Sequence, residues 1–234
     1  VPVASVSVNL AAATLLVGQT TQATAVARDA AGNVLTGRVV AWSSANTAIA
    51  TVSGTGLVTA VALGSAAIRA TVEGIQGSST LTVGVGAAAS MAAVSVVTQS
   101  AAAGTAVAAP PSVRVRDIAG SPVSGVNVTF TLTAGAGSTT PASPATVATN
   151  ATGVATLTTW TLGNVVGANT VSAAVSGLTG SPVVFNATGV AGAASIIAAN
   201  SVVTQSATAG TAVGAPPSVK VTDAVGNAVS GVVV

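Results

Sequence analysis

Several short segments of the chain alternate between apolar and mainly polar positions. Residues 126–132 read Val-Asn-Val-Thr-Phe-Thr-Leu, residues 66–72 read Ala-Ala-Ile-Arg-Ala-Thr-Val, and residues 171–175 and 183–187 follow the same rule. A period of two puts successive side chains on opposite faces of a β-strand. Gly, Pro or Asn breaks the pattern about every 8–12 residues. We therefore predict an all-β fold of antiparallel β-sandwiches, with about seven strands in each sandwich and no helix.

The chain repeats itself with an offset of 106 residues. Residues 95–128 and 201–234 are identical at 25 of 34 positions. The match already begins at Gly86-Ala87-Ala88 and Gly192-Ala193-Ala194, which lie in alanine-rich joints. A fixed period of this kind indicates tandem modules. We predict modules at residues 1–84 and 85–190, followed by a partial copy of the second module at residues 191–234.

One turn motif occurs once in each of these segments. Asp29, Asp117 and Asp223 each stand three residues before a glycine that is followed by Asn or Ser. In such a turn the carboxylate caps the local backbone and the glycine supplies a positive φ. We expect the same strand–turn–strand corner three times, with turn capping as the role of each aspartate.

The composition excludes most kinds of catalytic and metal-binding site. Hydrophobic residues make up 50% of the chain, aromatic residues 2% and charged residues 4%, and there is no His, Cys or Tyr. Zinc, iron–sulfur and haem sites, disulfides, and the commonest acid–base and nucleophilic groups are therefore excluded. Of the four acids, only Asp29 and Glu73 share a module, and no motif brings them together as a glycosidase pair. We predict that the protein is not an enzyme and has no catalytic or cofactor-binding residues.

Calcium is the alternative explanation for the aspartate turns. Asp29 with Asn33, or Asp223 with Asn227, would supply one carboxylate and an amide oxygen. Calcium takes six to eight oxygen ligands, so we predict no metal site.

The aromatic and sequon residues fit structural roles. Trp42 and Trp160 lie within strand patterns, so we expect both in the cores of the first two modules and no exposed platform for a sugar or other small molecule. Asn-x-Thr sequons begin at Asn127, Asn150 and Asn186, but chance matches are common in a threonine-rich chain.

Charge and hydropathy narrow the partners further. The net charge is +2, and the six basic residues are spread along the chain, which does not suit a nucleic-acid groove. No window holds the roughly 20 consecutive apolar residues of a membrane span. No charged residue lies between Asp117 and Lys220. We expect an uncharged surface and other protein subunits as the partners.

Residues 3–83 resemble a group 2 bacterial immunoglobulin-like (Ig-like) domain. The motifs that carry the resemblance are, in order, Val6-Ser7-Val8, Leu16-Val17-Gly18-Gln19-Thr20, Ala41-Trp42-Ser43-Ser44-Ala45-Asn46, Ile49-Ala50-Thr51-Val52, Gly56-Leu57-Val58-Thr59-Ala60, Gly64-Ser65-Ala66-Ala67-Ile68 and Thr80-Leu81-Thr82-Val83.

Residues 85–190 are similar to the group 1 Ig-like domains of the invasin and intimin type. The matching features are the Asp117 turn, Val126-Asn127-Val128-Thr129-Phe130, Gly153-Val154-Ala155-Thr156-Leu157, Trp160-Thr161-Leu162-Gly163 and Val183-Val184-Phe185-Asn186-Ala187-Thr188. Together the two resemblances imply tandem Ig-like β-sandwiches in an extracytoplasmic protein of a bacterium, at the cell surface or in the periplasm. They imply no particular activity, because such modules serve as stalks, spacers, adhesins and docking domains.

We therefore predict a non-catalytic structural or interaction protein: a stalk, spacer or adhesion module. The alternative is an accessory structural subunit docked on the periplasmic or outer face of a multi-subunit membrane complex, for example a bacterial photosynthetic complex. For the partial third module we expect either that the native protein continues beyond Val234 or that a partner completes the sandwich by strand addition.

Overall fold

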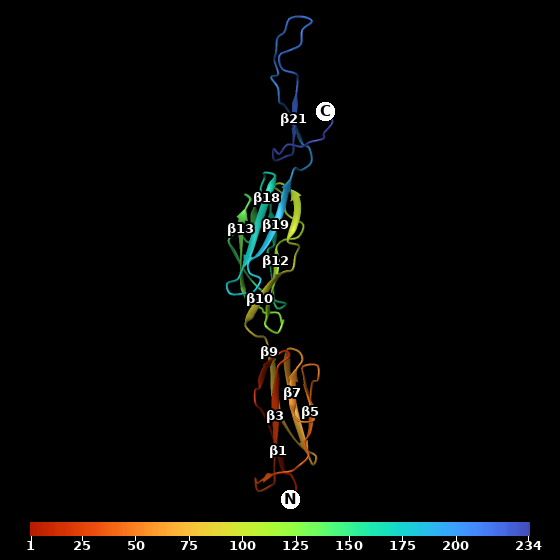
Figure 1. Ribbon diagram of the computed structural model, residues 1–234, viewed down its shortest axis with the longest axis vertical. Helices are drawn as coiled ribbons and strands as arrows, with labels where there is room; N and C mark the ends of the chain where they lie inside the picture. Colours follow the sequence, from red (N-terminus) through yellow and green to blue (C-terminus); the bar gives the residue numbers. More distant parts are fainter. The chain divides into compact units, whose positions relative to one another are not determined.

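The computed structural model describes residues 1–234, and all 21 of its regular elements are β-strands (Figure 1). It divides into two compact units. The first unit comprises Val1–Ala88 with the loop Arg116–Val123, and the second comprises Ala89–Val115 with Ser124–Val234. No helix is present that could cross a membrane. The all-β prediction is confirmed, whereas the module boundaries at 84/85 and 190/191 stay a prediction.

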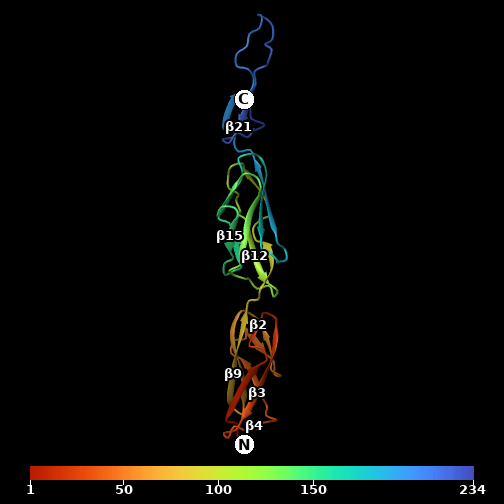
Figure 2. The same ribbon diagram turned by 90° about the vertical axis from the view of Figure 1, so that its left-hand side faces the viewer.

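The first unit contains a sandwich of two sheets. One sheet has the order β1-β3-β7-β6, with β4 paired to β3, and the other has the order β2-β9-β8-β5. Figure 2 shows β3 and β9, which belong to opposite sheets. The strands are β1 (Ser5–Leu10), β2 (Thr14–Leu16), β3 (Thr20–Arg28), β4 (Val34–Leu35), β5 (Ala41–Ser44), β6 (Ala50–Val52), β7 (Leu57–Ala60), β8 (Gly64–Val72) and β9 (Ile75–Gly84).

The alternation predicted the core of this sandwich correctly on β8. Ala66, Ile68, Ala70 and Val72 are all at most 3% exposed. Ala66 and Ile68 share a cluster with Val58 of the opposite sheet, and Val72 packs in a second cluster with Val3 and Ala27. Burial of apolar surface, which stabilises by about 25 cal/mol per Å², is the main stabilising contribution. Because these side chains are small, the two sheets have to pack closely to bury them.

The second unit contains a second sandwich. Its sheets have the orders β10-β12-β16 and β11-β19-β18-β13-β15, and β14 and β17 form a small third sheet. The strands are β10 (Ala88–Ala93), β11 (Thr98–Ala102), β12 (Ser112–Asp117), β13 (Asn127–Ala134), β14 (Ser138–Thr140), β15 (Ala145–Ala148), β16 (Val154–Thr156), β17 (Thr159–Thr161), β18 (Gly167–Ala174) and β19 (Val183–Val190). Each sandwich has more strands than the seven expected, because short edge pieces such as β4, β14 and β17 form separate strands.

The core of the second sandwich is built around its aromatic residues. Phe130, Trp160 and Phe185 are fully buried. The Nε1 of Trp160 is buried without a hydrogen-bond partner, a loss of about 1–3 kcal/mol that the burial of the large ring has to offset. Residues 191–234 add only a two-stranded sheet, β20 (Ile196–Ala199) and β21 (Val219–Thr222).

The core prediction is right for Trp160 and right only in part for Trp42. Trp42 is only half-buried and packs at the margin of the first core. Its strand, β5, is an edge strand that pairs only with β8, so the sheet covers one flank of the indole. A Cβ atom at Gly56 would lie 3.1 Å from Cε2 of Trp42, so the other sheet contacts the ring through this turn.

We expect the two tryptophans to differ in their effect on stability. Trp160→Ala should lower the free energy of unfolding by about 3–5 kcal/mol, as for other large-to-small core changes. Trp42→Ala should cost clearly less, because part of its ring already contacts water. Urea unfolding followed by far-UV circular dichroism measures both losses, and equal losses would contradict this description of the cores.

Candidate functional site: the aspartate clasp

The three aspartate turns form as the sequence predicts. In the first turn Oδ1 of Asp29 accepts the N–H groups of Ala31 and Asn33 at 3.0 and 2.9 Å. Gly32 has a φ of 85°, in the left-handed region that favours glycine. This turn closes on itself, and its carboxylate accepts hydrogen bonds only from within the motif.

The second turn also forms a hydrogen bond with the segment at the start of its own repeat. Oδ1 of Asp117 accepts the N–H of Ser121 at 2.8 Å, and Oδ2 accepts the N–H of Gly86 at 2.8 Å. Gly86 lies just before β10, and Asp117 is the last residue of β12. The carboxylate is only 3% exposed. We call this hydrogen bond, from the N–H of an upstream glycine to the carboxylate of a turn aspartate, the aspartate clasp.

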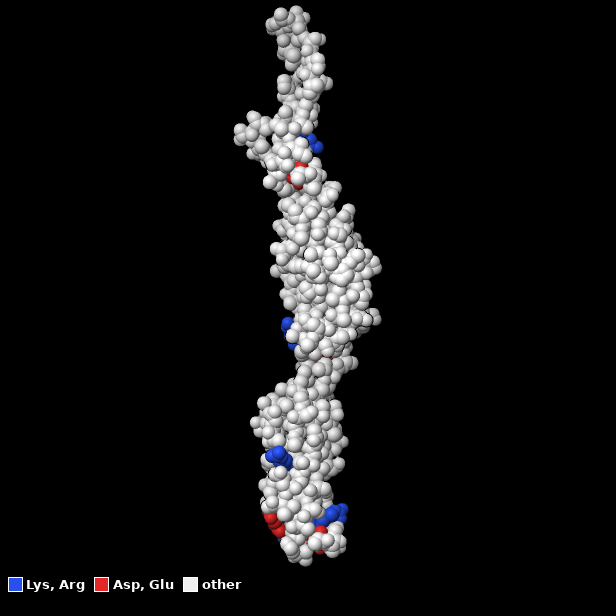
Figure 3. All heavy atoms as spheres, turned by 180° about the vertical axis from the view of Figure 1, so that it is seen from behind, with Lys and Arg blue, Asp and Glu red and all other residues white.

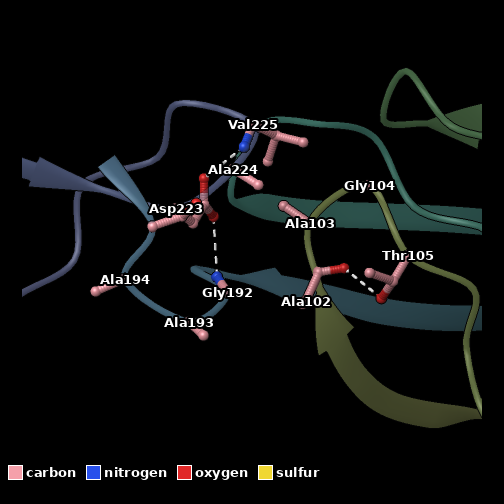
Figure 4. Close-up of a pocket in the computed structure, with 11 residues that line it drawn as sticks. Ala102, Ala103, Gly104, Thr105, Gly192, Ala193, Ala194, Asp223, Ala224 and Val225 are labelled. Atoms are coloured by element: carbon pink, nitrogen blue, oxygen red, sulfur yellow. Dashed lines mark hydrogen bonds between the residues drawn. The ribbon is translucent and has the colours of Figure 1, made fainter. Parts of the chain in front are cut away.

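The third turn makes the same clasp. Oδ2 of Asp223 accepts the N–H of Gly192 at 2.9 Å, and Oδ1 accepts the N–H of Val225 (Figure 4). Oδ1 also accepts the N–H of Asn227. Gly and Asp are 31 residues apart in both clasps. Asp223 is 2% exposed. The repeat therefore reproduces a tertiary contact as well as a turn.

Asn227 extends the third clasp to the end of the second sandwich. Its Nδ2 donates to Oδ2 of Asp223 at 3.0 Å and to the carbonyl of Asn164 at 2.8 Å. Its Oδ1 accepts the N–H of Val166 at 3.2 Å. Residues 164 and 166 lie in the loop before β18, so one amide side chain joins the Asp223 turn to this loop.

The clasp borders a pocket of about 470 Å³ in the second unit. Its walls are Ala102, Ala103, Gly104, Thr105, the joint at residues 192–195, and residues 223–225 (Figure 4). Thr105 is engaged with the carbonyl of Ala102 at 2.7 Å. Asp223 accepts four hydrogen bonds, so its carboxylate holds the backbone in place. The geometry is that of a joint between segments.

Hydrogen bonding stabilises the ionised form of the Asp223 and Asp29 carboxylates. The N–H of Gly192, followed by the contacts from Asn227 and Val225, lowers the pKa of Asp223 to about 2. The side chain and backbone of Asn33 likewise lower the pKa of Asp29. Such shifts follow because the donors bind the charged form more strongly than the neutral form.

The other residues considered in the sequence have structural contacts. Glu73 forms an ion pair with Arg38 at 2.5 Å between side chains that both contact water. Oδ1 of Asn150 caps its own turn by accepting the N–H groups of Thr152 and Val154.

Both asparagines of the calcium hypothesis turn an amide nitrogen toward a carboxylate. Nδ2 of Asn33 donates to Asp29 at 3.1 Å, and Nδ2 of Asn227 donates to Asp223 at 3.0 Å. In both turns the amide nitrogen donates a hydrogen bond to the carboxylate. The atom that faces the carboxylate is therefore a nitrogen, whereas calcium takes oxygen ligands.

Sequence reasoning missed the second half of the clasp. The turn explains one carboxylate oxygen, but the partner of the other oxygen lies 31 residues upstream. The available signal was the repeated glycine at 86 and 192, which stands at the same distance before each aspartate.

The lowered pKa of Asp223 makes the third clasp sensitive to acid. Because its pKa is about 2 in the folded chain and near 3.8 ordinarily, the clasp contributes stability above about pH 4 and loses it as the pH falls toward 2. In ¹H–¹⁵N NMR spectra, the amide resonance of Gly192 should shift with a midpoint near pH 2. A midpoint at 3.8 or above would contradict the clasp.

Comparison with known proteins adds a family for part of the chain. The model of the bacterial Ig-like domain (group 2) matches residues 2–85. No curated protein matches the chain. Among solved structures, the bacterial integrin-binding protein invasin is similar with a TM-score of 0.51 and 18% identity, over 97% of this chain and 48% of that one.

Two further structures have lower TM-scores. The Escherichia coli adhesin FdeC has a TM-score of 0.47 and 24% identity, over 80% of this chain and 66% of that chain. Domains 1–6 of the surface-layer protein SbsC have a TM-score of 0.39 and 20% identity, over 98% of this chain and 32% of that chain. The chain thus spans just under two thirds of FdeC and about a third of the SbsC structure.

Proposed function

We propose that this chain, which carries a group 2 bacterial Ig-like domain at residues 2–85 within tandem Ig-like β-sandwiches, is a non-catalytic spacer module of an extracytoplasmic bacterial protein. Its task is to hold and present neighbouring parts of a longer surface or periplasmic protein. The likeness to adhesins and surface-layer proteins is in line with such a location, and protein subunits are the partners we expect.

The aspartate clasp is the observation that carries this proposal. A flexible linker would need no contact between a joint glycine and a turn on the following strand. Here the buried carboxylates of Asp117 and Asp223 bind the joints at Gly86 and Gly192 in the same way. Charge-assisted hydrogen bonds in a buried setting are among the stronger polar contacts, so Gly86 and Gly192 are each held against the aspartate turn of the repeat that they begin. A spacer needs this property.

The proposal predicts that breaking the third clasp loosens the joint without unfolding the sandwich. The chain has no cysteine, so Thr188→Cys on β19 and Lys220→Cys on β21 allow specific attachment of two spin labels at exposed positions. Electron–electron resonance should give a narrow distance distribution for the doubly labelled chain. Asp223→Ala should broaden this distribution by about twofold or more, because the carboxylate no longer holds Gly192.

The matched control is Asp29→Ala in the same labelled chain. Asp29 caps an equivalent turn but is bonded only within its motif. This control should leave the distance distribution unchanged. Equal widths for the parent chain and Asp223→Ala would reject the spacer function.

A second candidate is an accessory subunit docked on the outer face of a membrane complex. The observation in its favour is the absence of charge from residue 118 to residue 219. Figure 3 shows few charged atoms on the face it presents. In this stretch Val165, Val166 and Val184 are 75%, 46% and 44% exposed, and an uncharged, partly apolar surface suits burial against another protein.

Carbene footprinting tests the docked-subunit candidate. If it holds, labelling of Val165 and Val184 should fall severalfold in native membranes compared with the isolated chain, because a partner covers these side chains. The same labelling in both samples would contradict docking through this surface and leave the spacer function unaffected.

A further inference from the structure

The side chain of Asn227 bonds to the second sandwich as a neighbouring strand would. Its Nδ2 donates to the carbonyl of Asn164 at 2.8 Å, and its Oδ1 accepts the N–H of Val166 at 3.2 Å. A β-strand offers its neighbour the same two groups, a carbonyl and an N–H two residues apart on one edge. One amide side chain therefore takes the place of a strand beside the loop 164–166. We call this pair of hydrogen bonds the amide lock.

A buried side chain of the second sandwich fixes the loop that the lock uses. Asn169 on β18 is 2% exposed. Its Oδ1 accepts the N–H of Gly163 at 3.0 Å, and its Nδ2 donates to the carbonyl of Gly167 at 3.2 Å. Because one residue holds both ends of the loop, the second sandwich itself sets the shape of the site to which Asn227 binds.

The first sandwich has a loop of the same construction. The N–H of Gly18 donates to the carbonyl of Ala60 at 3.0 Å, and the N–H of Gly104 donates to the carbonyl of Gly163 at 2.9 Å. In both sandwiches this hydrogen bond closes the start of the loop that leads into a long strand, β8 or β18.

The ends of the two loops also correspond. Gly64 and Gly167 are the first residues of β8 and β18, and their φ angles are 135° and 138°. Residues 61–63 of the first sandwich are therefore the counterpart of the loop 164–166. The N–H of Leu63, the last residue of this counterpart, donates no backbone hydrogen bond.

The aspartate turns lie beside corresponding ends of the two sandwiches. A Cβ atom at Gly86 would lie 3.0 Å from Cδ1 of Leu16, and one at Gly192 would lie 3.8 Å from Cβ of Ala102. Leu16 and Ala102 end β2 and β11, which pair in parallel with the last strand of each sandwich. The clasp then ties each of these glycines to its turn.

The two turns differ in the side chain at the position of Asn227. The fourth residue after the aspartate is Ser121 in the Asp117 turn and Asn227 in the Asp223 turn. The backbone is the same in both, because the N–H of each fourth residue donates to Oδ1 of its aspartate at 2.8 Å. The shorter side chain of Ser121 forms no hydrogen bond with residues 61–63.

We propose that the fourth residue after the turn aspartate decides whether a repeat binds the loop of the module before it. Asparagine suits this position because its amide carries both a donor and an acceptor, whereas serine has one short hydroxyl and ionised aspartate has no donor. Asn227 recognises two backbone groups, so its partner is defined by the shape of the loop. The inference rests on the spacer function, because it distinguishes joints with the lock from joints without it.

The first test removes the lock. In the full chain carrying Asn227→Ser, hydrogen exchange of the Val166 amide, followed by NMR, should be about tenfold or more faster than in the parent chain, because the amide loses its acceptor. The matched control is Asn33→Ser, which makes the same change at the fourth position of the Asp29 turn. This control should leave the exchange of Val166 unchanged.

The second test transfers the lock to the first sandwich. In Ser121→Asn, the new amide should bond to the loop 61–63 and slow exchange of the Leu63 amide by about tenfold or more. A gain of protection cannot result from a loss of folding. Val166 should exchange as in the parent chain, since its own lock is untouched.

Unchanged exchange of Val166 in Asn227→Ser would overturn the proposal, because the lock would then not protect this amide. Unchanged exchange of Leu63 in Ser121→Asn would overturn it as well, because the fourth residue would then not decide the contact. The distance measurement on Asp223→Ala tests the spacer function separately. A broadened distribution there, together with unchanged Leu63 in Ser121→Asn, would reject the selective role of this position and retain the spacer function.

Discussion

Asp117 and Asp223 are the only charged residues among the buried residues of the chain. The local structure at the start of each repeat depends on the groups that donate hydrogen bonds to these two carboxylates. A buried carboxylate without donors is costly, so the surrounding backbone has to supply N–H groups. The turn provides donors for one oxygen, and the joint glycine provides the donor for the other. The start of the repeat and the end of its second strand are thereby fixed together.

The remainder of the structure relies on small apolar residues packed between sheets. The chain has no cysteine, and its one ion pair joins side chains in contact with water, where such pairs contribute little. Stability therefore comes from alternating valine, alanine and isoleucine positions and, in the second sandwich, from Phe130, Trp160 and Phe185. Such a core leaves few polar groups available for chemistry, which agrees with a spacer whose interactions are made by backbone and surface.

Local signals were sufficient to predict the fold class and much of the core. Period two along β8 and β13 identified Ile68 and Phe130 as buried, because alternation is a property of the single strand. The partial exposure of Trp42 could not be predicted this way, since it depends on β5 being the last strand in its sheet. The clasp could not be predicted for a similar reason. Its donor, Gly192, is distant in sequence from Asp223, and only the three-dimensional fold brings the two residues together.

The central claim is that the joint glycines are held by buried carboxylates. Amide hydrogen exchange of Gly86 and Gly192, resolved by NMR at neutral pH, tests it most directly. We predict that both amides exchange about 100-fold or more slowly than those of the adjacent residues Ala87 and Ala193, for which no hydrogen bond from the amide is present. Exchange of the two glycine amides at the rate of these neighbours would contradict the clasp and the account built on it.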